Sequence, residues 1–154
     1  MSWQTEIGTI VRHLVDDTDF SSPTYPDNRI ETTILVASQL IQTELNFENT
    51  YSINVESCSL SPDPTLLADK DDGFINLTAL KAACIILGAE YKSHGLSAVK
   101  VSDGPSSIDM SGAASHMKHL YDSLCERYEQ YKLNFASVNN NVGKAILSPY
   151  GSWR

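Results

Sequence analysis

The sequence lacks the features that mark membrane and secreted proteins. It contains no run of roughly 18 or more apolar residues, the length a membrane-spanning helix needs. Residues 1–17 have no basic start, apolar block or small-residue cleavage site of the kind found in signal peptides. We therefore expect the chain to be made in a cytoplasm and to stay soluble there.

Cysteine is scarce. The three cysteines, Cys58, Cys84 and Cys125, lie far apart and form no CxxC pair. An odd number of cysteines in a reducing compartment is typical of free thiols, not of a disulfide framework. The sequence therefore predicts three free thiols with a structural role.

Motifs for catalysis or cofactor binding are also missing. The chain has no GxSxG, Walker or GxGxxG sequence. His116 and His119 share helical spacing but have no third metal ligand beside them, which indicates exposed helix residues. The acidic run 69–73 does not match the register of a calcium loop. We predict a protein that is not an enzyme and that binds no cofactor or metal.

Basic residues are few in the first half of the chain. Residues 1–75 hold 13 Asp or Glu against 3 Lys or Arg, a net charge of −10, whereas residues 76–154 hold 6 against 8, a net charge of +2. Phosphate binding depends on clustered Lys and Arg, so this distribution argues against a protein that grips nucleic acid. The acidic residues could line a passage for DNA or simply solvate the surface, and composition does not choose between these.

Helical periodicity dominates what is present. With 154 residues, 42% of them hydrophobic, the chain fits one globular domain. Apolar residues recur at helical spacing over 3–15, 27–45, 75–92 and 113–135. These patterns predict an all-α fold of about four main helices in a small bundle.

The third and fourth predicted helices differ in character. The third is rich in small residues, Ala79, Ala82, Ala83, Gly88 and Ala89, which permit close approach, so we place it at the centre and expect Gly95 to end it. The fourth carries a long aromatic-rich apolar stripe, namely Met117, Leu120, Tyr121, Leu124, Tyr128, Tyr131 and Phe135.

Short extended elements interrupt the helices. Residues 51–56 alternate apolar and polar side chains, which predicts a half-exposed strand. Residues 98–110 contain Asp103-Gly104-Pro105 between two short extended pieces, which predicts a projecting β-hairpin or loop.

The last residues form a separate segment. We divide the chain into a helical domain, 1–135, and an extended C-terminal arm, 136–154, which begins with asparagine and glycine. The arm then carries apolar anchors, Ile146, Leu147, Pro149, Tyr150 and Trp153. Burying such side chains stabilises by roughly 1.5–3 kcal/mol each, so we expect the arm to dock on its own subunit or on a neighbour.

The order of these features resembles a known family, the head–tail connector adaptors of tailed bacteriophages. The resemblance rests on turn and core residues over most of 10–135, in the stretches 25–30, 36–37, 51–55, 60–65, 74–77, 80–84, 99–104 and 107–109. It implies a small helical structural protein of the virion neck. Such proteins form a ring, usually of twelve copies, beneath the portal protein, extend the channel for double-stranded DNA and receive the next neck or tail protein.

The resemblance also implies contact regions. For portal or subunit contacts it indicates Val99, Lys100, Val101, Asp103, Gly104, Ile108, Ile146, Leu147, Pro149, Tyr150 and Trp153. Our hypothesis for the DNA channel is that some of the acidic residues face it, the candidates being Asp16, Asp17, Asp19, Glu44, Glu48, Asp69, Asp71 and Asp72.

Two alternatives remain open. One is another neck component, a head-completion stopper or a tail terminator, which would be richer in strand. The other is a small helical interaction or regulatory protein with no place in a virion.

Overall fold

The computed structural model describes residues 2–68, 70–97, 101–103, 106–108 and 111–139. The helices are α1 (Trp3–Leu14), α2 (Asp27–Glu44), α3 (Asp72–Ser97) and α4 (Ser111–Asn139). The strands are β1 (Ser52–Asn54), β2 (Ser59–Ser61), β3 (Val101–Asp103) and β4 (Ser106–Ile108). The prediction of a small, mainly helical fold with four main helices is confirmed.

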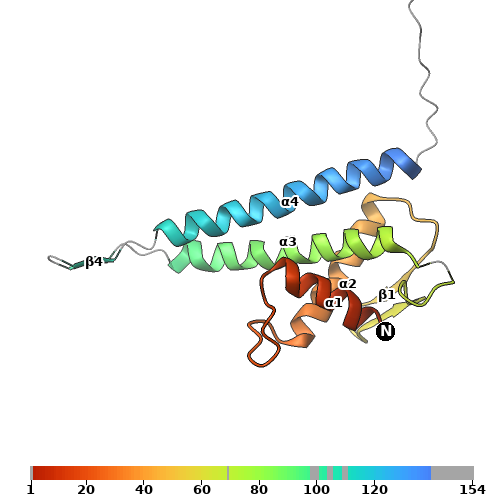
Figure 1. Ribbon diagram of the computed structural model, residues 1–154, viewed down its shortest axis with the longest axis horizontal. Coiled ribbons are helices and arrows are strands. Elements are labelled where there is room, and N and C mark those ends of the chain that lie inside the picture. Colours follow the sequence, from red (N-terminus) through yellow and green to blue (C-terminus); the bar gives the residue numbers. More distant parts are fainter. Residues whose placement is uncertain (1, 69, 98–100, 104–105, 109–110, 140–154) are drawn as a thin grey trace, which may run out of the picture.

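Helix α3 is the centre of the fold. It packs against α1 and α2 on one side and against α4, which runs antiparallel to it, on the other (Figure 1). The main core lies between α1, α2 and the first half of α3, where Ile7, Ile34 and Leu77 have no exposed surface. The predicted central position of the third helix is therefore confirmed.

The small residues of α3 explain its position. Ala79, Ala82 and Ala83 are fully buried. A Cβ atom on Gly88 would come within 3.0 Å of the Tyr121 ring on α4. Side chains of this size let neighbouring helices approach α3 closely, and a larger residue at Gly88 would require the Tyr121 ring to shift by a few tenths of an ångström.

Helix α3 is longer than predicted. It continues through Gly95 to Ser97, because a glycine weakens a helix interior by only about 1 kcal/mol and does not by itself end it. Over Asp72–Ser93 it is long and apolar enough to cross a membrane, but more than half of this stretch is buried inside the fold. A central core helix has the same composition, so its packing accounts for its apolarity.

Both extended regions form two-stranded antiparallel hairpins. Strand β1 is shorter than predicted and pairs with β2, which the sequence did not indicate, through Ile53 opposite Leu60. Strands β3 and β4 pair with Val101 opposite Ile108, as the turn signal predicted, and lie beyond the end of the α3–α4 pair (Figure 1).

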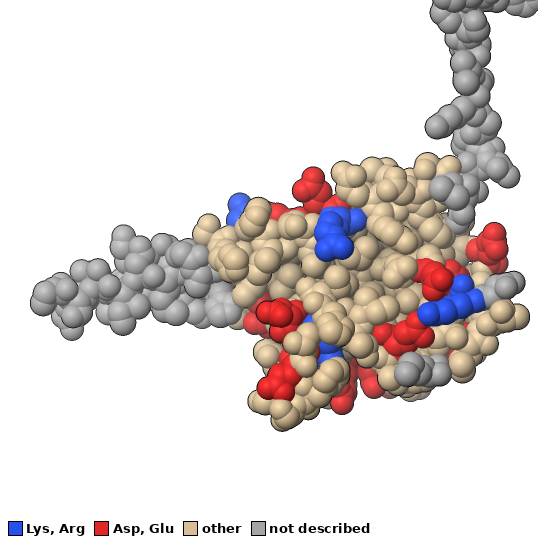
Figure 2. All heavy atoms as spheres, in the orientation of Figure 1, with Lys and Arg blue, Asp and Glu red and all other residues tan. Residues whose placement is uncertain are grey.

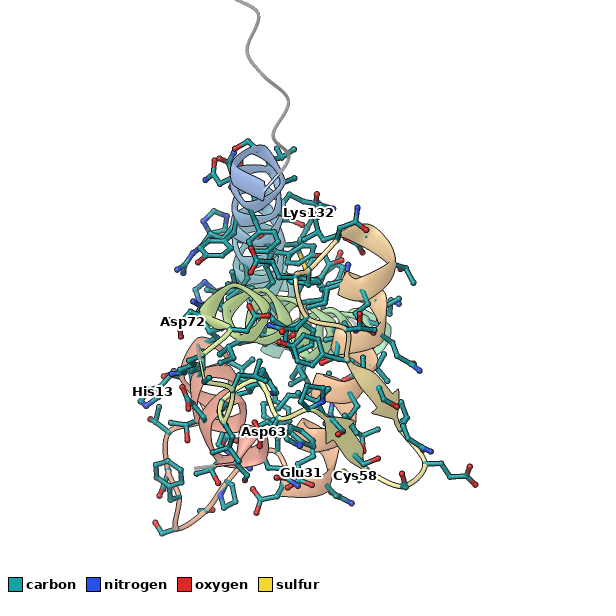
Figure 3. The ribbon with its side chains drawn as sticks, turned by 90° about the vertical axis from the view of Figure 1, so that its right-hand side faces the viewer. His13, Glu31, Cys58, Asp63, Asp72 and Lys132 are labelled. Carbon is teal, nitrogen blue, oxygen red and sulfur yellow. A yellow bond between two sulfur atoms is a disulfide. The ribbon has the colours of Figure 1, made fainter. Side chains whose placement is uncertain are left out.

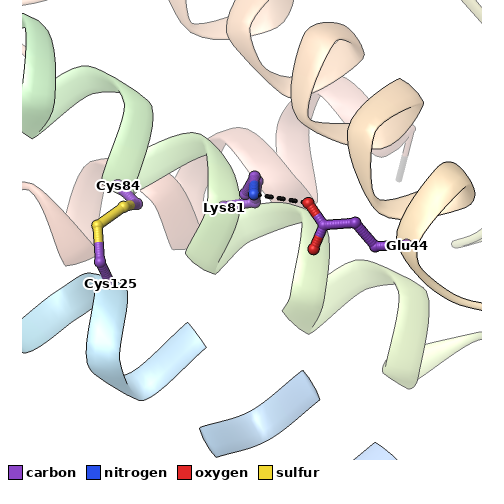
Figure 4. Close-up of a disulfide and its surroundings, with 4 residues drawn as sticks. All are labelled: Glu44, Lys81, Cys84 and Cys125. Atoms are coloured by element: carbon purple, nitrogen blue, oxygen red, sulfur yellow. Dashed lines mark hydrogen bonds and ion pairs between the residues drawn. A yellow bond between two sulfur atoms is a disulfide. The ribbon is translucent and has the colours of Figure 1, made fainter. Parts of the chain in front are cut away.

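The prediction of three free thiols is wrong for two of them. Cys84 on α3 and Cys125 on α4 form a disulfide, with Cα atoms 5.4 Å apart (Figure 4). Antiparallel packing brings together residues that are 41 positions apart, which sequence spacing does not reveal. Cys58 is free and half-buried, and its thiol donates a 3.5 Å hydrogen bond to Glu31, close beside it in Figure 3.

Candidate assembly surfaces and polar clusters

A buried ion pair closes the loop between α1 and α2. Arg12, in the last turn of α1, pairs with Asp17, and both side chains are almost fully buried. The Arg12 guanidinium also donates to the Tyr25 carbonyl at 2.9 Å, and Asp17 accepts a hydrogen bond from the Thr24 amide at 2.7 Å. Asp17 therefore stabilises the loop from inside the subunit. Because its side chain is buried there, the prediction that it faces a channel is wrong.

A second polar cluster ties α2 to α3 and α4. Glu44, the last residue of α2, accepts hydrogen bonds from Tyr128 at 2.7 Å and Lys132 at 3.0 Å. It accepts a third from Lys81 at 2.9 Å (Figure 4). Both lysine ammonium groups also lie over the Tyr128 ring, at 4.5 and 5.2 Å from its centroid. This Glu44 cluster therefore links three helices that are distant in sequence, and the ion pair of Arg29 with Glu90 at 3.0 Å links α2 to α3 a second time.

The contacts of Glu44 control its ionisation. Partial burial acts to raise the pKa of its carboxyl group, but the hydrogen bonds from Tyr128, Lys81 and Lys132 outweigh it and lower the pKa to about 2. Burial and the neighbouring Glu44 carboxylate raise the pKa of the Tyr128 hydroxyl. Glu44 is thus ionised at neutral pH and has a structural role in the subunit.

Asp71 caps α3. Its carboxylate accepts a hydrogen bond from the Phe74 amide at 2.9 Å, the interaction that satisfies a free N–H at a helix start. It also accepts from the Tyr51 hydroxyl at 2.6 Å. Burial and this carboxylate raise the pKa of Tyr51. Asp71 therefore fixes the start of α3 against the segment that leads into β1.

The remaining acidic candidates are spread over the molecule. Asp16 and Asp19 are exposed in the α1–α2 loop, Glu48 follows α2, and Asp72 begins α3. Asp69 lies outside the described residues. On the face drawn in Figure 2, acidic side chains form several separate groups with Lys and Arg between them.

Most of the predicted contact residues lie in parts of the chain that the structure does not describe. Val99, Lys100, Gly104, Ile146, Leu147, Pro149, Tyr150 and Trp153 lie outside the described residues. Val101 and Asp103 are the first and last residues of β3, and Ile108 ends β4. These three are brought together on the hairpin beyond the end of the α3–α4 pair (Figure 1).

A groove of about 380 Å³ runs between α1 and α4, over the surface of α3. Its apolar lining comes from Ile10, Leu14, Leu80 and Tyr131, and its polar lining from Asn76, Arg127, Gln130 and Asn134. Tyr131 is 40% exposed. Leu120 lies about three helical turns before it, on the same flank of α4, and is 42% exposed. We call the groove together with Leu120 the α1–α4 flank.

The sequence did not reveal this flank. Leu120 and Tyr131 belong to the predicted apolar stripe of the fourth helix, and periodicity does not distinguish the buried from the exposed members of that stripe. In the structure Leu124 and Tyr128 are buried against α3, whereas Leu120 and Tyr131 lie at the edge of that contact. The width of the stripe, greater than one neighbouring helix covers, was the available signal.

Among the residues whose side chains are described, no group of three or more His, Cys, Asp or Glu is placed to hold a metal ion. His116 and His119 are both exposed on α4. The chain matches no family model, no curated protein and no solved structure.

Proposed function

We propose that this chain is a structural subunit of a phage particle, a head–tail connector adaptor that forms a ring beneath the portal protein. The observation that supports the proposal most is the α1–α4 flank. Its apolar groove and the exposed Leu120 and Tyr131 are features of surfaces that bury against another protein chain. The described polar clusters, by contrast, serve the fold of the single subunit.

A ring requires two different patches on each subunit. In a cyclic assembly one surface of a copy meets a different surface of the next copy. The proposal assigns the α1–α4 flank to one side of this contact and the β3–β4 hairpin, beyond the end of the α3–α4 pair, to a portal or subunit contact (Figure 1). The partners are further copies of the chain, about twelve by the family resemblance, the portal protein and the next neck or tail protein.

The acidic character fits a passive role towards DNA. Like charges repel the phosphate backbone, so exposed carboxylates on a channel wall would keep DNA mobile. Asp16, Asp19, Glu48 and Asp72 are exposed candidates; Glu44 is also exposed, but its carboxylate is bound within the Glu44 cluster. In this proposal the protein resides in the virion neck and contacts double-stranded DNA without binding it specifically.

The alternatives use the same surface in different ways. Stoppers and tail terminators are richer in strand, so the helical architecture favours the adaptor among neck components. A helical interaction or regulatory protein outside a virion would also need an exposed apolar flank. That alternative predicts a partner other than a portal.

Negative-stain imaging of the chain mixed with the portal protein encoded beside it tests the proposal. We expect a ring of added density on the narrow end of the portal. A bare portal, with both proteins folded, would contradict the adaptor role. The double variant Leu120→Glu with Tyr131→Glu should remove the ring. Leu133→Glu, two residues beyond Tyr131 and so on another side of α4, is the matched control that should keep it.

A further inference from the structure

A cleft of about 570 Å³ lies where the start of α3 meets the last turns of α4. Phe47, Leu67 and Phe135 supply its apolar surface, and the rings of Phe47 and Phe135 are 5.1 Å apart. Glu48, Asp71 and Asp72 supply its acidic surface. The cleft therefore combines an apolar lining with negative charge.

The negative charge of the cleft is only partly neutralised. Among the described residues that line the cleft, Lys70 is the one basic residue, and it already pairs with Glu6 and, at 3.6 Å, with Asp72. The Asp71 carboxylate already accepts hydrogen bonds from the Phe74 amide and the Tyr51 hydroxyl. Glu48 is exposed and the Asp72 side chain is 73% exposed. Both carboxylates are therefore accessible for an ion pair with a basic residue of a bound segment.

The end of the chain has the complementary composition. Residues 144–154, KAILSPYGSWR, contain Lys144 and Arg154, no acidic residue, and the apolar pair Ile146 and Leu147. An apolar pair next to a lysine matches an apolar cleft with an acidic rim. Charge and hydrophobicity thus both favour this segment as the occupant.

Helix α4 also ends close to the cleft. Helix α4 ends at Asn139, four residues after Phe135, which is about 6 Å along the helix axis. Residues 140–143 then connect Asn139 to Lys144 and allow a span of up to about 17 Å. The segment can therefore reach the cleft of its own chain.

We infer that this cleft is the docking site of the chain's own C-terminal segment, with Ile146 and Leu147 against Phe47, Leu67 and Phe135, and Lys144 beside Glu48 and Asp72. Tethering gives the segment an effective concentration in the millimolar range, so weak binding suffices to occupy the cleft. Pockets of about 300–1,000 Å³ hold small ligands, so this one accommodates a few side chains and not the whole segment. The inference concerns a single chain and stands whether or not the chain forms a ring.

Trypsin cleavage after Lys144 in the full-length protein tests the inference. A docked segment must leave the cleft before the protease can bind it. We expect cleavage about five- to tenfold slower than in a synthetic peptide of residues 140–154, which corresponds to a docked fraction of about 80–90%. Cleavage at the same rate in protein and peptide would overturn the inference.

Charge variants test whether binding in this cleft causes the protection from trypsin. Glu48→Gln combined with Asp72→Asn should weaken the docking equilibrium about fivefold, since each exposed ion pair contributes a factor of about 1.4 to 5 to it. For a segment that is about 80–90% docked, this speeds cleavage of the full-length chain about threefold. Glu56→Gln, an exposed carboxylate in the β1–β2 connection, is the control and should change nothing. Equal protection in all three proteins, each with an unchanged melting transition, would show that the segment does not use the cleft.

Dilution separates docking within a chain from docking between chains. Protection within a chain does not depend on protein concentration, so it should persist over a hundredfold dilution. Loss of protection on dilution would mean that the cleft takes the segment of a second copy, and the intrachain inference would then be wrong.

Discussion

The two sides of α3 are packed differently. Towards α1 and α2, α3 meets aliphatic side chains without exposed surface, such as Ile7, Val11 and Ile34, and polar clusters close the loops. Towards α4, fewer side chains of the facing helix are buried: among the residues of α4 whose side chains are described, these are Leu124 and Tyr128. The disulfide and the Glu44 cluster add to this contact.

If the chain forms the proposed ring, this difference divides stability from assembly. The α1–α2 side buries its apolar surface within the subunit, which stabilises the fold by itself. The α4 side is held by a covalent bond and a polar cluster, so it keeps apolar surface exposed without losing its position. The exposed flank of α4 can then serve contacts with another chain.

Breaking the buried ion pair should produce the largest effect on the α1–α2 side. Asp17→Asn leaves the buried Arg12 with Asp27, whose side chain is 87% exposed, as its remaining carboxylate partner. Loss of the buried partner of such a pair costs about 3–5 kcal/mol, and the contact with Asp27 places the expected effect at the lower end of this range. Asp16→Asn, at the exposed neighbouring position, should change the free energy of unfolding by less than about 0.5 kcal/mol. Chemical denaturation measures both, and equal effects would contradict the structural role of Asp17.

A pair of leucine truncations compares the buried core beside α3 with the exposed surface of α4. Leu77→Ala removes a side chain with no exposed surface and should cost about 3 kcal/mol. Leu133→Ala on α4, where the side chain is 66% exposed, should cost less than about 0.5 kcal/mol. Thermal melts of the two variants give the difference, and a large loss for Leu133→Ala would show that α4 is buried more widely than described.

Removing the disulfide should loosen α4 selectively. Cys84→Ser with Cys125→Ser opens a cross-link between residues 41 positions apart, which stabilises by about 2–4 kcal/mol. Hydrogen exchange should then increase in α4 before it increases in α1 and α2. A uniform increase over all helices would contradict the division between the two sides.

The Glu44 cluster should produce the smallest effect and a defined pH dependence. Because folding lowers the pKa of Glu44 from 4.5 to about 2, its stabilisation is complete above pH about 4.5 and is lost as the pH falls towards 2. Glu44→Gln should cost about 1–2 kcal/mol at neutral pH, a value reduced for solvent screening because the side chain is 29% exposed.

Denaturation of the wild type and Glu44→Gln across this pH range checks the prediction. The difference in stability between the two proteins should shrink below pH about 4.5 and disappear near pH 2. A constant difference over the whole range would show that the ionised carboxylate is not the stabilising group.

The sequence predicted the elements better than the contacts between them. Helical periodicity located the four helices, and the small residues of the third, including Ala82 and Ala83, predicted its central position. The Cys84–Cys125 pair and the burial of Asp17 were missed, because each depends on a partner brought close by folding. Periodicity alone also did not separate Leu120 and Tyr131 from the buried part of their stripe.

The functional assignments depend on partners, and no pattern within one chain determines a partner. The acidic candidates illustrate the point, since Asp17 and Asp71 are engaged within the subunit while Asp16 and Glu48 remain exposed. The roles proposed for the hairpin and the C-terminal arm stay predictions.

Cysteine labelling at position 131 tests the central claim most directly. Tyr131→Cys in a Cys58→Ser background places one free thiol on the α1–α4 flank, because Cys84 and Cys125 are joined in the disulfide. We expect fast labelling in the isolated chain and strong protection once the chain is mixed with the portal protein. Equal labelling rates in the isolated and the portal-bound chain would contradict the assignment of this flank to subunit contacts.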